Sequence, residues 1–234
     1  MIKAVIFDLD DTLINEVDYI RSGFLEVARY LNSQLGVDCN ELVTMMWMLF
    51  KQRRRDVFNR LLREYAYTSN DLVTKCVEVY REHIPDLRMR NGAESLLKDL
   101  FDSGYKLGLI TDGRPQGQWN KINAIGLKQY VSYIIVTDEL GGVMFRKPCD
   151  VAYRKMLSAM AIKPESAVYV GDNLYKDFIT PNVLGMQSVM LKNYYGVYLH
   201  DVGLEINTIN KPLYYANDFT SLRSLLIDEM DVLI

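Results

Sequence analysis

Acidic side chains that follow short apolar runs are the residues of this sequence best suited to chemistry. Asp8 and Asp10 come just after the run Ala4 to Phe7, and Asp172 comes just after the run Ala167 to Val170. If these runs end at one place in the fold, three carboxylates gather there and repel one another unless a cation neutralises them. Because Mg²⁺ prefers hard oxygen ligands, we predict a magnesium site that includes Asp8, Asp10 and Asp172.

Two further residues are suited to holding a phosphate group beside this metal. Thr111 follows the apolar run Leu107 to Ile110, and Lys147 precedes Pro148 in a loop. A lysine supplies a positive point charge and a threonine hydroxyl supplies a neutral donor. Together with Mg²⁺ they can hold a phosphate dianion and the transition state of its transfer. The residue types therefore favour phosphoryl chemistry.

These side chains meet only if the apolar runs are parallel strands of one sheet. Five runs are short, apolar and rich in β-branched residues, as is typical of strands buried on both faces: Ala4 to Phe7, Leu107 to Ile110, Tyr133 to Val136, Ala167 to Val170 and Ser188 to Leu191. Helical spacing separates the later runs, at Gln116 to Ile125, Asp150 to Met160 and Asp177 to Leu184. This order predicts a doubly wound α/β sheet with the site at its carboxyl edge.

The interval between the first two runs has a different pattern. It contains no convincing strand, and its apolar residues recur at helical intervals. The spacing predicts three or four helices, near Val17 to Leu35, Asn40 to Tyr65 and Asn70 to His83. We therefore expect an α/β catalytic core of residues 1–14 and 91–234 and an inserted helical cap of residues 15–90.

Several other features have ordinary structural interpretations. Leu213 to Ala216 is expected to form an edge strand, and Asp218 to cap a final helix. The basic run Arg53 to Arg55 is expected to lie on a solvated helix face. His83 and His200 are isolated in the sequence, so we assign them structural roles.

The four polar sites, in their order along the chain, resemble the motifs of the haloacid dehalogenase (HAD) superfamily. The matching residues are Asp8 to Leu13, Thr111, Lys147, and Gly171 to Asn173 with Asp177. The resemblance covers nearly the whole chain and implies a Rossmann-like core. A helical cap inserted between the first and second motifs is similar to the class I members of that superfamily.

The resemblance implies a role for each motif residue. Asp8 would be the nucleophile that forms an aspartyl-phosphate, and Asp10 would act first as general acid and then as general base. Asp8 and Asp172 would bind the metal through carboxylates, and Asp10 through its backbone carbonyl. Asp177 would orient the metal's waters or Lys147. The residues expected to bind the phosphoryl group are Thr111, Asp112 and Lys147, with Asp112 standing where many relatives carry Asn.

Three polar residues follow the second motif directly. Arg114, Gln116 and Gln118 lie just beyond Gly113. We expect them to face the cleft between core and cap, where they would contact the substrate.

These residues favour a magnesium-dependent phosphatase that acts on a small phosphorylated metabolite. A residue such as Asp10 favours phosphoester chemistry, because members that break carbon–halogen bonds do not need an acid there. A sugar phosphomutase of the same superfamily is the first alternative. The second is a protein of another class, either a non-catalytic phosphate-binding protein or a phosphoacceptor signalling module, although signalling modules lack a large inserted cap.

The composition narrows the expected partners. The 27 Lys and Arg residues nearly balance the 30 Asp and Glu residues, and a net charge of −3 provides no general attraction to nucleic acid or anionic lipid. The longest apolar runs are much shorter than the roughly 20 residues of a membrane-spanning helix. The 3 cysteines are odd in number and lack metal-ligand spacing. We therefore expect reduced thiols in a cytoplasmic enzyme, with no nucleic-acid or membrane partner.

Overall fold

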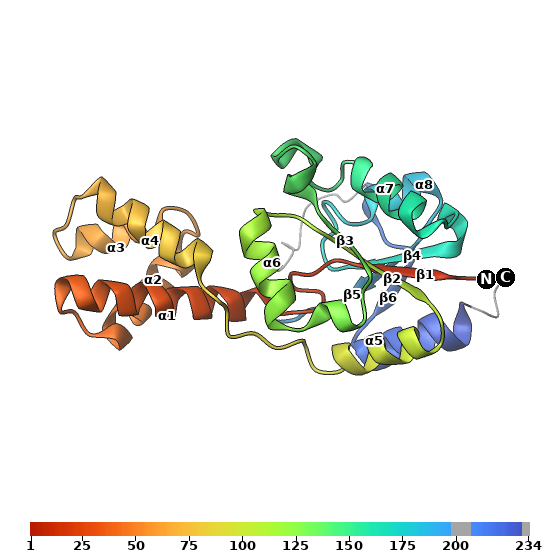
Figure 1. Ribbon diagram of the computed structural model, residues 1–234, viewed down its shortest axis with the longest axis horizontal. Coiled ribbons are helices and arrows are strands. Elements are labelled where there is room, and N and C mark those ends of the chain that lie inside the picture. Colours follow the sequence, from red (N-terminus) through yellow and green to blue (C-terminus); the bar gives the residue numbers. More distant parts are fainter. Residues whose placement is uncertain (198–206, 231–234) are drawn as a thin grey trace. The chain divides into compact units, whose positions relative to one another are not determined.

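The computed structural model describes residues 1–197 and 207–230, and within them a six-stranded sheet forms the core of the larger unit (Figure 1). All neighbouring strands are parallel. In spatial order the strands are β3 (Tyr133–Val136), β2 (Lys106–Thr111), β1 (Ala4–Phe7), β4 (Ala167–Gly171), β5 (Gln187–Leu191) and β6 (Tyr214–Ala216). The five predicted strands and the predicted edge strand are confirmed.

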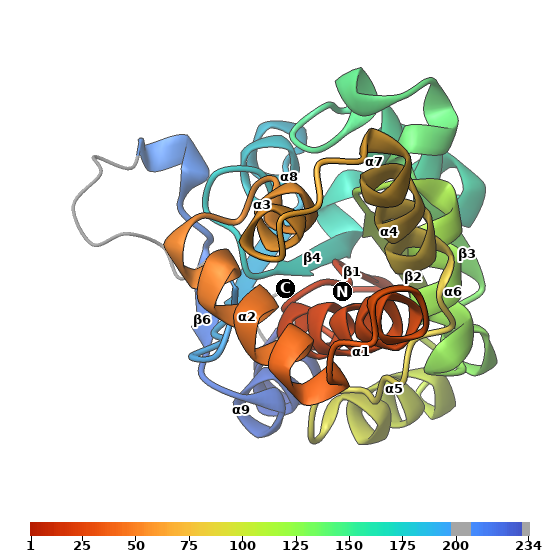
Figure 2. The same ribbon diagram turned by 90° about the vertical axis from the view of Figure 1, so that its left-hand side faces the viewer.

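Helices cover both faces of the sheet (Figure 2). α7 (Val151–Met160) packs on one face, where Ala4, Ile6 and Tyr169 join its buried side chains in one cluster. α8 (Ile179–Leu184) lies on the same side, and α5 (Ala93–Asp102) and α9 (Phe219–Arg223) lie on the other. Because side chains alternate along a strand, β1 must be apolar at every position to fill both layers. All four of its residues are fully buried.

The helices between the later strands lie within two residues of their predicted positions. α6 (Pro115–Ala124), α7 and α8 follow β2, β3 and β4 in the chain. α5 was not predicted. At the end of the described chain, the Asp218 side chain accepts a hydrogen bond from the Ser221 N–H over 2.7 Å, so the predicted cap of α9 is confirmed.

The chain divides into two compact units, one of Met1–Val17 and Arg88–Ile234 and one of Asp18–Leu87. The smaller unit consists of helices, as predicted: α1 (Glu16–Leu35), α2 (Cys39–Gln52), α3 (Val57–Glu64) and α4 (Asn70–Glu82). Its action as a cap stays a prediction. No helix among the described residues combines the length and apolar character needed to cross a membrane.

The predicted helix from Asn40 to Tyr65 is wrong as a continuous element. It ends at Gln52 and starts again at Val57. The Arg60 guanidinium donates to the Leu49 carbonyl over 2.8 Å and to two carbonyls of the intervening arginine run, so the end of α2 is satisfied by a side chain from α3. The three arginines are exposed, as expected, but they lie in the break between α2 and α3, so their predicted place on a helix face is wrong.

Aromatic rings fill the core of the helical unit. Phe24 lies 5.1 Å from Trp47 and 6.1 Å from Tyr80 between ring centroids. His83 packs against Tyr19 with centroids 4.9 Å apart, and its Nδ1 bonds to the Tyr80 carbonyl oxygen over 2.7 Å. His83 therefore has the structural place assigned to it. His200 lies outside the described residues.

Candidate active site

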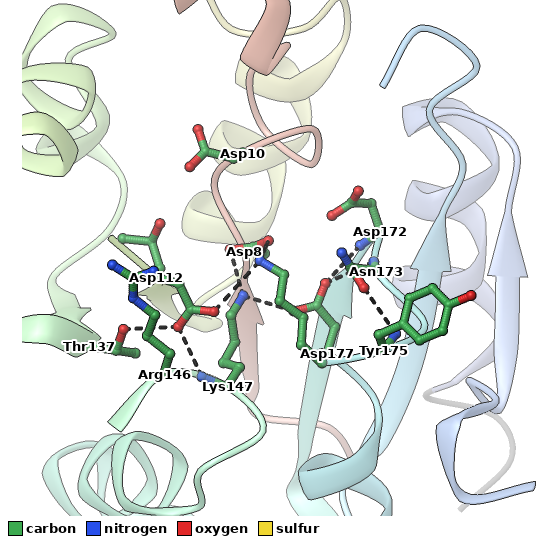
Figure 3. Close-up of polar contacts among 12 residues, drawn as sticks. Asp8, Asp10, Asp112, Thr137, Arg146, Lys147, Asp172, Asn173, Tyr175 and Asp177 are labelled. Carbon is green, nitrogen blue, oxygen red and sulfur yellow. Dashed lines mark hydrogen bonds and ion pairs between the residues drawn. The ribbon is translucent and has the colours of Figure 1, made fainter. Parts of the chain in front are cut away.

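The carboxyl ends of the three central strands bring the predicted motif residues together. Asp8 follows β1, Thr111 ends β2, and Asp172 follows β4. β1 lies between β2 and β4 with Phe7 in register with Leu109 and Val170, so the three strands end at one edge. Figure 3 shows Asp8, Lys147, Asp172 and Asp177 gathered at this edge.

Lys147 is the buried centre of this group. Its Nζ lies 2.7 Å from Asp8 Oδ1 and 2.8 Å from Asp177 Oδ1, and it donates to the Tyr169 hydroxyl over 2.9 Å. Burial would lower the pKa of this ammonium group, but the carboxylates of Asp177 and Asp8 hold its pKa well above the ordinary value. All three ammonium donors are thus directed at site residues, and the charge is retained.

Asp177 fixes the loop that carries Asp172. Its Oδ2 accepts hydrogen bonds from the N–H groups of Asp172 and Asn173, over 3.2 and 2.9 Å. Gly171 permits this approach, because a Cβ there would lie 2.6 Å from Asp177 Oδ2. Burial would raise the pKa of Asp177, but Lys147 and Lys176 keep it below the ordinary value. Asp177 is therefore an ionised, fully buried support of the site.

Three carboxylates form a candidate metal centre. One oxygen from each of Asp8, Asp172 and Asp177 lies within 4.8 Å of the other two. Burial raises the pKa of Asp8 to about 6 against the opposing effect of Lys147. Burial, Asp177 and Asp8 together raise the pKa of Asp172 well above its ordinary value. Asp8 Oδ2 is buried and accepts no hydrogen bond from the described residues. A cluster of hard carboxylate oxygens, one of which accepts no hydrogen bond from the described residues, fits a divalent cation.

Asp10 lies apart from this metal group. Its side chain points elsewhere in Figure 3, with Oδ1 2.7 Å from Lys121 Nζ and Oδ2 accepting from the Gln118 amide over 3.0 Å. Burial would raise the pKa of Asp10, but the charge and hydrogen bond of Lys121 and the Gln118 hydrogen bond lower it. The carboxylate of Asp10 is thus outside the metal centre, and contact through its backbone carbonyl stays a prediction.

The residues expected to bind phosphate are also held by neighbours. The Thr111 hydroxyl accepts a short hydrogen bond from the Gln118 amide. Asp112 Oδ1 accepts from the Thr137 hydroxyl over 2.9 Å and from the Lys147 N–H over 3.0 Å. Asp112 therefore ties together the loops after β2 and β3 and places the backbone of Lys147.

A polar pocket opens beside these groups. Its lining includes Asp10, Asp11, Glu16, Asp112, Gln118, Lys121, Arg146, Lys147, Asp172, Asn173 and Lys176. Burial and the nearby carboxylates of Asp10 and Asp11 raise the pKa of Glu16 to about 7. Lys176 Nζ lies 3.8 Å from Asp8 Oδ2, so the candidate nucleophile has cations near both of its oxygens. The pocket can hold an anion next to Asp8.

Four of these lining residues were not predicted: Glu16, Lys121, Arg146 and Lys176. Gln118 was predicted to face the ligand and lines the pocket, and Lys121 stands three residues later on the same helix face. That spacing was a usable signal for Lys121. An acid in the first turn of a helix, such as Glu16, is too ordinary to single out. Arg114 and Gln116, predicted alongside Gln118, are exposed.

Comparison with a model of protein families gives one match over most of the chain. Residues 5–191 match the model of the haloacid dehalogenase-like hydrolases. The matched range contains every motif residue named above.

Individual relatives agree with this match. The chain is 32% identical to glyceraldehyde 3-phosphate phosphatase of Pyrococcus furiosus, over 84% of this chain and 82% of that protein. It is 26% identical to pyrophosphatase PpaX of Halalkalibacterium halodurans, over 74% of this chain and 75% of that protein. In fold it is similar to the HAD-hydrolase YfnB of Bacillus subtilis bound to magnesium, with a TM-score of 0.66 at 20% identity and coverage of 97% and 99% of the two chains.

Proposed function

This chain belongs to the haloacid dehalogenase-like hydrolase family and is a phosphatase, and we propose that it hydrolyses a small phosphomonoester with Asp8 as nucleophile and Mg²⁺ as cofactor. One observation carries the assignment to Asp8. This carboxylate is buried, bound on one oxygen by Lys147, free of hydrogen bonds from the described residues on the other, and next to the polar pocket. No other carboxylate of the group combines these features.

In the first step an Asp8 oxygen would attack phosphorus. The new bond to Asp8 forms as the bond from phosphorus to the leaving oxygen breaks, and Asp10, in its protonated form, gives its proton to that oxygen. Lys147, held by Asp177 and Tyr169, would offset negative charge on Asp8 and on the phosphoryl oxygens. Thr111 would donate its hydroxyl hydrogen to a phosphoryl oxygen.

In the second step water would release the phosphate. Asp10, now a carboxylate, takes a proton from a water molecule whose oxygen attacks phosphorus, and the bond between Asp8 and phosphorus breaks. Asp8, Asp172 and the Asp10 backbone carbonyl would hold Mg²⁺, which when bound would offset charge on the transferring group. Both Asp177 oxygens already accept contacts from the chain, so we assign Asp177 a supporting place beside the metal.

Glyceraldehyde 3-phosphate is the first substrate to test. Two curated relatives at 31% and 32% identity are named as its phosphatases, and each match covers more than four fifths of this chain. A pocket lined by both cations and carboxylates suits a small substrate that carries one phosphate and further polar groups. Pyrophosphate is the second compound to include, after the more distant relative.

The test is phosphate release from a panel of phosphorylated metabolites, measured with Mg²⁺ and with a chelator, on the native chain and on Asp8→Asn. We expect Mg²⁺-dependent hydrolysis that disappears in the variant. Asp102→Asn is the matched control, because the Asp102 side chain is exposed and forms its ion pair with the exposed Lys98. It should retain native rates. Hydrolysis that persists in Asp8→Asn would exclude Asp8 as nucleophile.

The location of the enzyme belongs to the proposal as well. Cys39, Cys76 and Cys149 are free thiols, and burial raises the pKa of Cys76 to about 12. Unpaired thiols suit a reducing compartment. We therefore place the enzyme in the cytoplasm.

A further inference from the structure

Helix α6 directs two buried polar side chains at the pocket. Gln118 and Lys121 are each only 4% exposed and stand three residues apart, so they share one face of the helix. A buried amide and a buried ammonium group are costly unless polar partners meet them. Lysine is also among the residues that are rarely fully buried. The polar contacts of Gln118 and Lys121 must therefore offset the cost of their burial.

Both side chains meet the same carboxylate. Lys121 Nζ lies 2.7 Å from Asp10 Oδ1, and Gln118 Nε2 lies 3.0 Å from Asp10 Oδ2. One donor on each oxygen fixes the plane of the carboxylate as well as its position. Gln118 also donates to the Thr111 hydroxyl, so the same helix face connects Asp10 with a second motif residue.

We propose that Lys121 and Gln118 are positioning residues that hold the Asp10 carboxyl group for both of its proton transfers, an inference that rests on the proposed function. In the first transfer the proton passes from Asp10 to the leaving oxygen. In the second it passes from water to Asp10. Neither Lys121 nor Gln118 exchanges a proton with the substrate; each acts through the orientation of Asp10.

This role has a consequence that depends on the leaving group. An alkoxide needs the proton of Asp10 to depart, whereas p-nitrophenolate departs readily without one. Both substrates yield the same aspartyl-phosphate, whose hydrolysis needs Asp10 as base. Misplacing Asp10 should therefore slow both steps for an alkyl phosphate. For p-nitrophenyl phosphate it should slow the second step only.

Lys121→Met tests the proposal, since methionine keeps an unbranched apolar stem and lacks the charge. With the best alkyl phosphate of the panel, we expect kcat to fall about 10²-fold, at the lower end of what a general acid or base contributes. With p-nitrophenyl phosphate we expect a rapid burst of p-nitrophenolate close to one equivalent per enzyme, followed by slow turnover. The native chain should show no such burst.

Further variants provide a second test and a control. Gln118→Leu should give a burst of the same kind, and it serves if Lys121→Met does not fold. Lys128→Met makes the same substitution at an exposed lysine just beyond α6, and it should behave as the native chain. In an Asp10→Asn background, Lys121→Met should cause no further loss of kcat, because the group that it positions is already gone.

The outcomes separate this inference from the proposed function. Equal losses of kcat on both substrates, without a burst, would overturn the positioning role, and so would losses that multiply in the double variant. A native chain without phosphatase activity, or full activity in Asp8→Asn, would instead overturn the proposed function. A burst in Lys121→Met together with native behaviour of Lys128→Met supports the positioning role.

Discussion

Lys147 is the residue on which the electrostatics of the site depend most. It lies between two buried carboxylates, with its side chain and that of Asp177 fully excluded from solvent and that of Asp8 nearly so. Taking three charges out of water is expensive, and the arrangement persists because each charge has a close partner of opposite sign. Removal of the central cation would leave two carboxylates buried and facing each other.

Lys147→Met is expected to abolish phosphatase activity and to lower the free energy of unfolding by about 3–5 kcal/mol, the usual cost of breaking a buried ion pair. Urea denaturation measures the stability. Lys98→Met is the matched control, because it removes a lysine from an ion pair in which both side chains are more than half exposed. That change should cost about 0–1 kcal/mol. Equal losses in the two variants would show that the buried cluster is not specially stabilising.

The motif residues were predictable because their types and their place after apolar runs are local properties of the sequence. Asp8, Asp172 and Lys147 meet in the structure as expected. Lys176 was missed because it reaches the site through a long side chain from a position where lysine is ordinary. Lys121 was missed although its spacing from Gln118 on the same helix face was a usable signal.

The turn after β4 shows how an element holds a catalytic carboxylate. β4 ends at Gly171, and the chain then folds back so that the Asp177 carboxylate lies over the N–H groups that follow the strand. The Asp177 side chain is short and is held at both oxygens. It therefore has little freedom to move away from any atom added at Gly171.

Gly171→Ala should displace Asp177, weaken metal binding and reduce kcat/KM at least tenfold, with a stability cost of about 1–3 kcal/mol for the overpacking. Gly108→Ala is the comparison within the same sheet. There the added carbon would meet the Met160 and Met156 side-chain ends, which are flexible and can shift. Its kcat/KM should stay within about threefold of native. Steady-state kinetics measure kcat/KM for both variants. An equal loss of kcat/KM in the two would contradict the role assigned to the turn.

At the scale of elements, the strands were predicted well, but the break between α2 and α3 was not predicted. The composition of a run such as Ala4 to Phe7 is enough to predict a strand that is buried on both faces of the sheet. The observed strand has those same bounds. The break between α2 and α3 depends on Arg60, which donates to carbonyl groups as far as eleven residues away. Helical periodicity continues across such a break, so the periodicity did not predict it.

The whole molecule should couple its stability to pH and to the metal. Burial raises the pKa of Asp8 from 3.8 to about 6, and burial together with the carboxylates of Asp177 and Asp8 raises that of Asp172 well above its ordinary value. The folded chain therefore keeps protons that the unfolded chain loses once the pH rises above about 4. Without metal, these two groups make the chain less stable as the pH rises from about 4 through about 6. A divalent cation binds the ionised carboxylates and should reverse this loss.

Mg²⁺ is accordingly expected to raise the Tm by several degrees at about pH 8, since a ligand at about 100 times its Kd adds about 2.7 kcal/mol. The shift at about pH 5 should be clearly smaller, because protons then compete for Asp8 and Asp172. Differential scanning calorimetry at both pH values measures it. Asp8→Asn should show a reduced shift at about pH 8. Equal Mg²⁺ shifts at the two pH values would argue against a metal site made of these carboxylates.

The most direct measurement is to trap the covalent intermediate. The enzyme is mixed with its best substrate and Mg²⁺, quenched during turnover, and treated with borohydride, which reduces an aspartyl-phosphate to homoserine. Peptide mass spectrometry then locates the modified residue. We predict homoserine at position 8 and unmodified aspartate at positions 10, 172 and 177. Steady turnover with modification at another aspartate, or with none at Asp8, would contradict the mechanism.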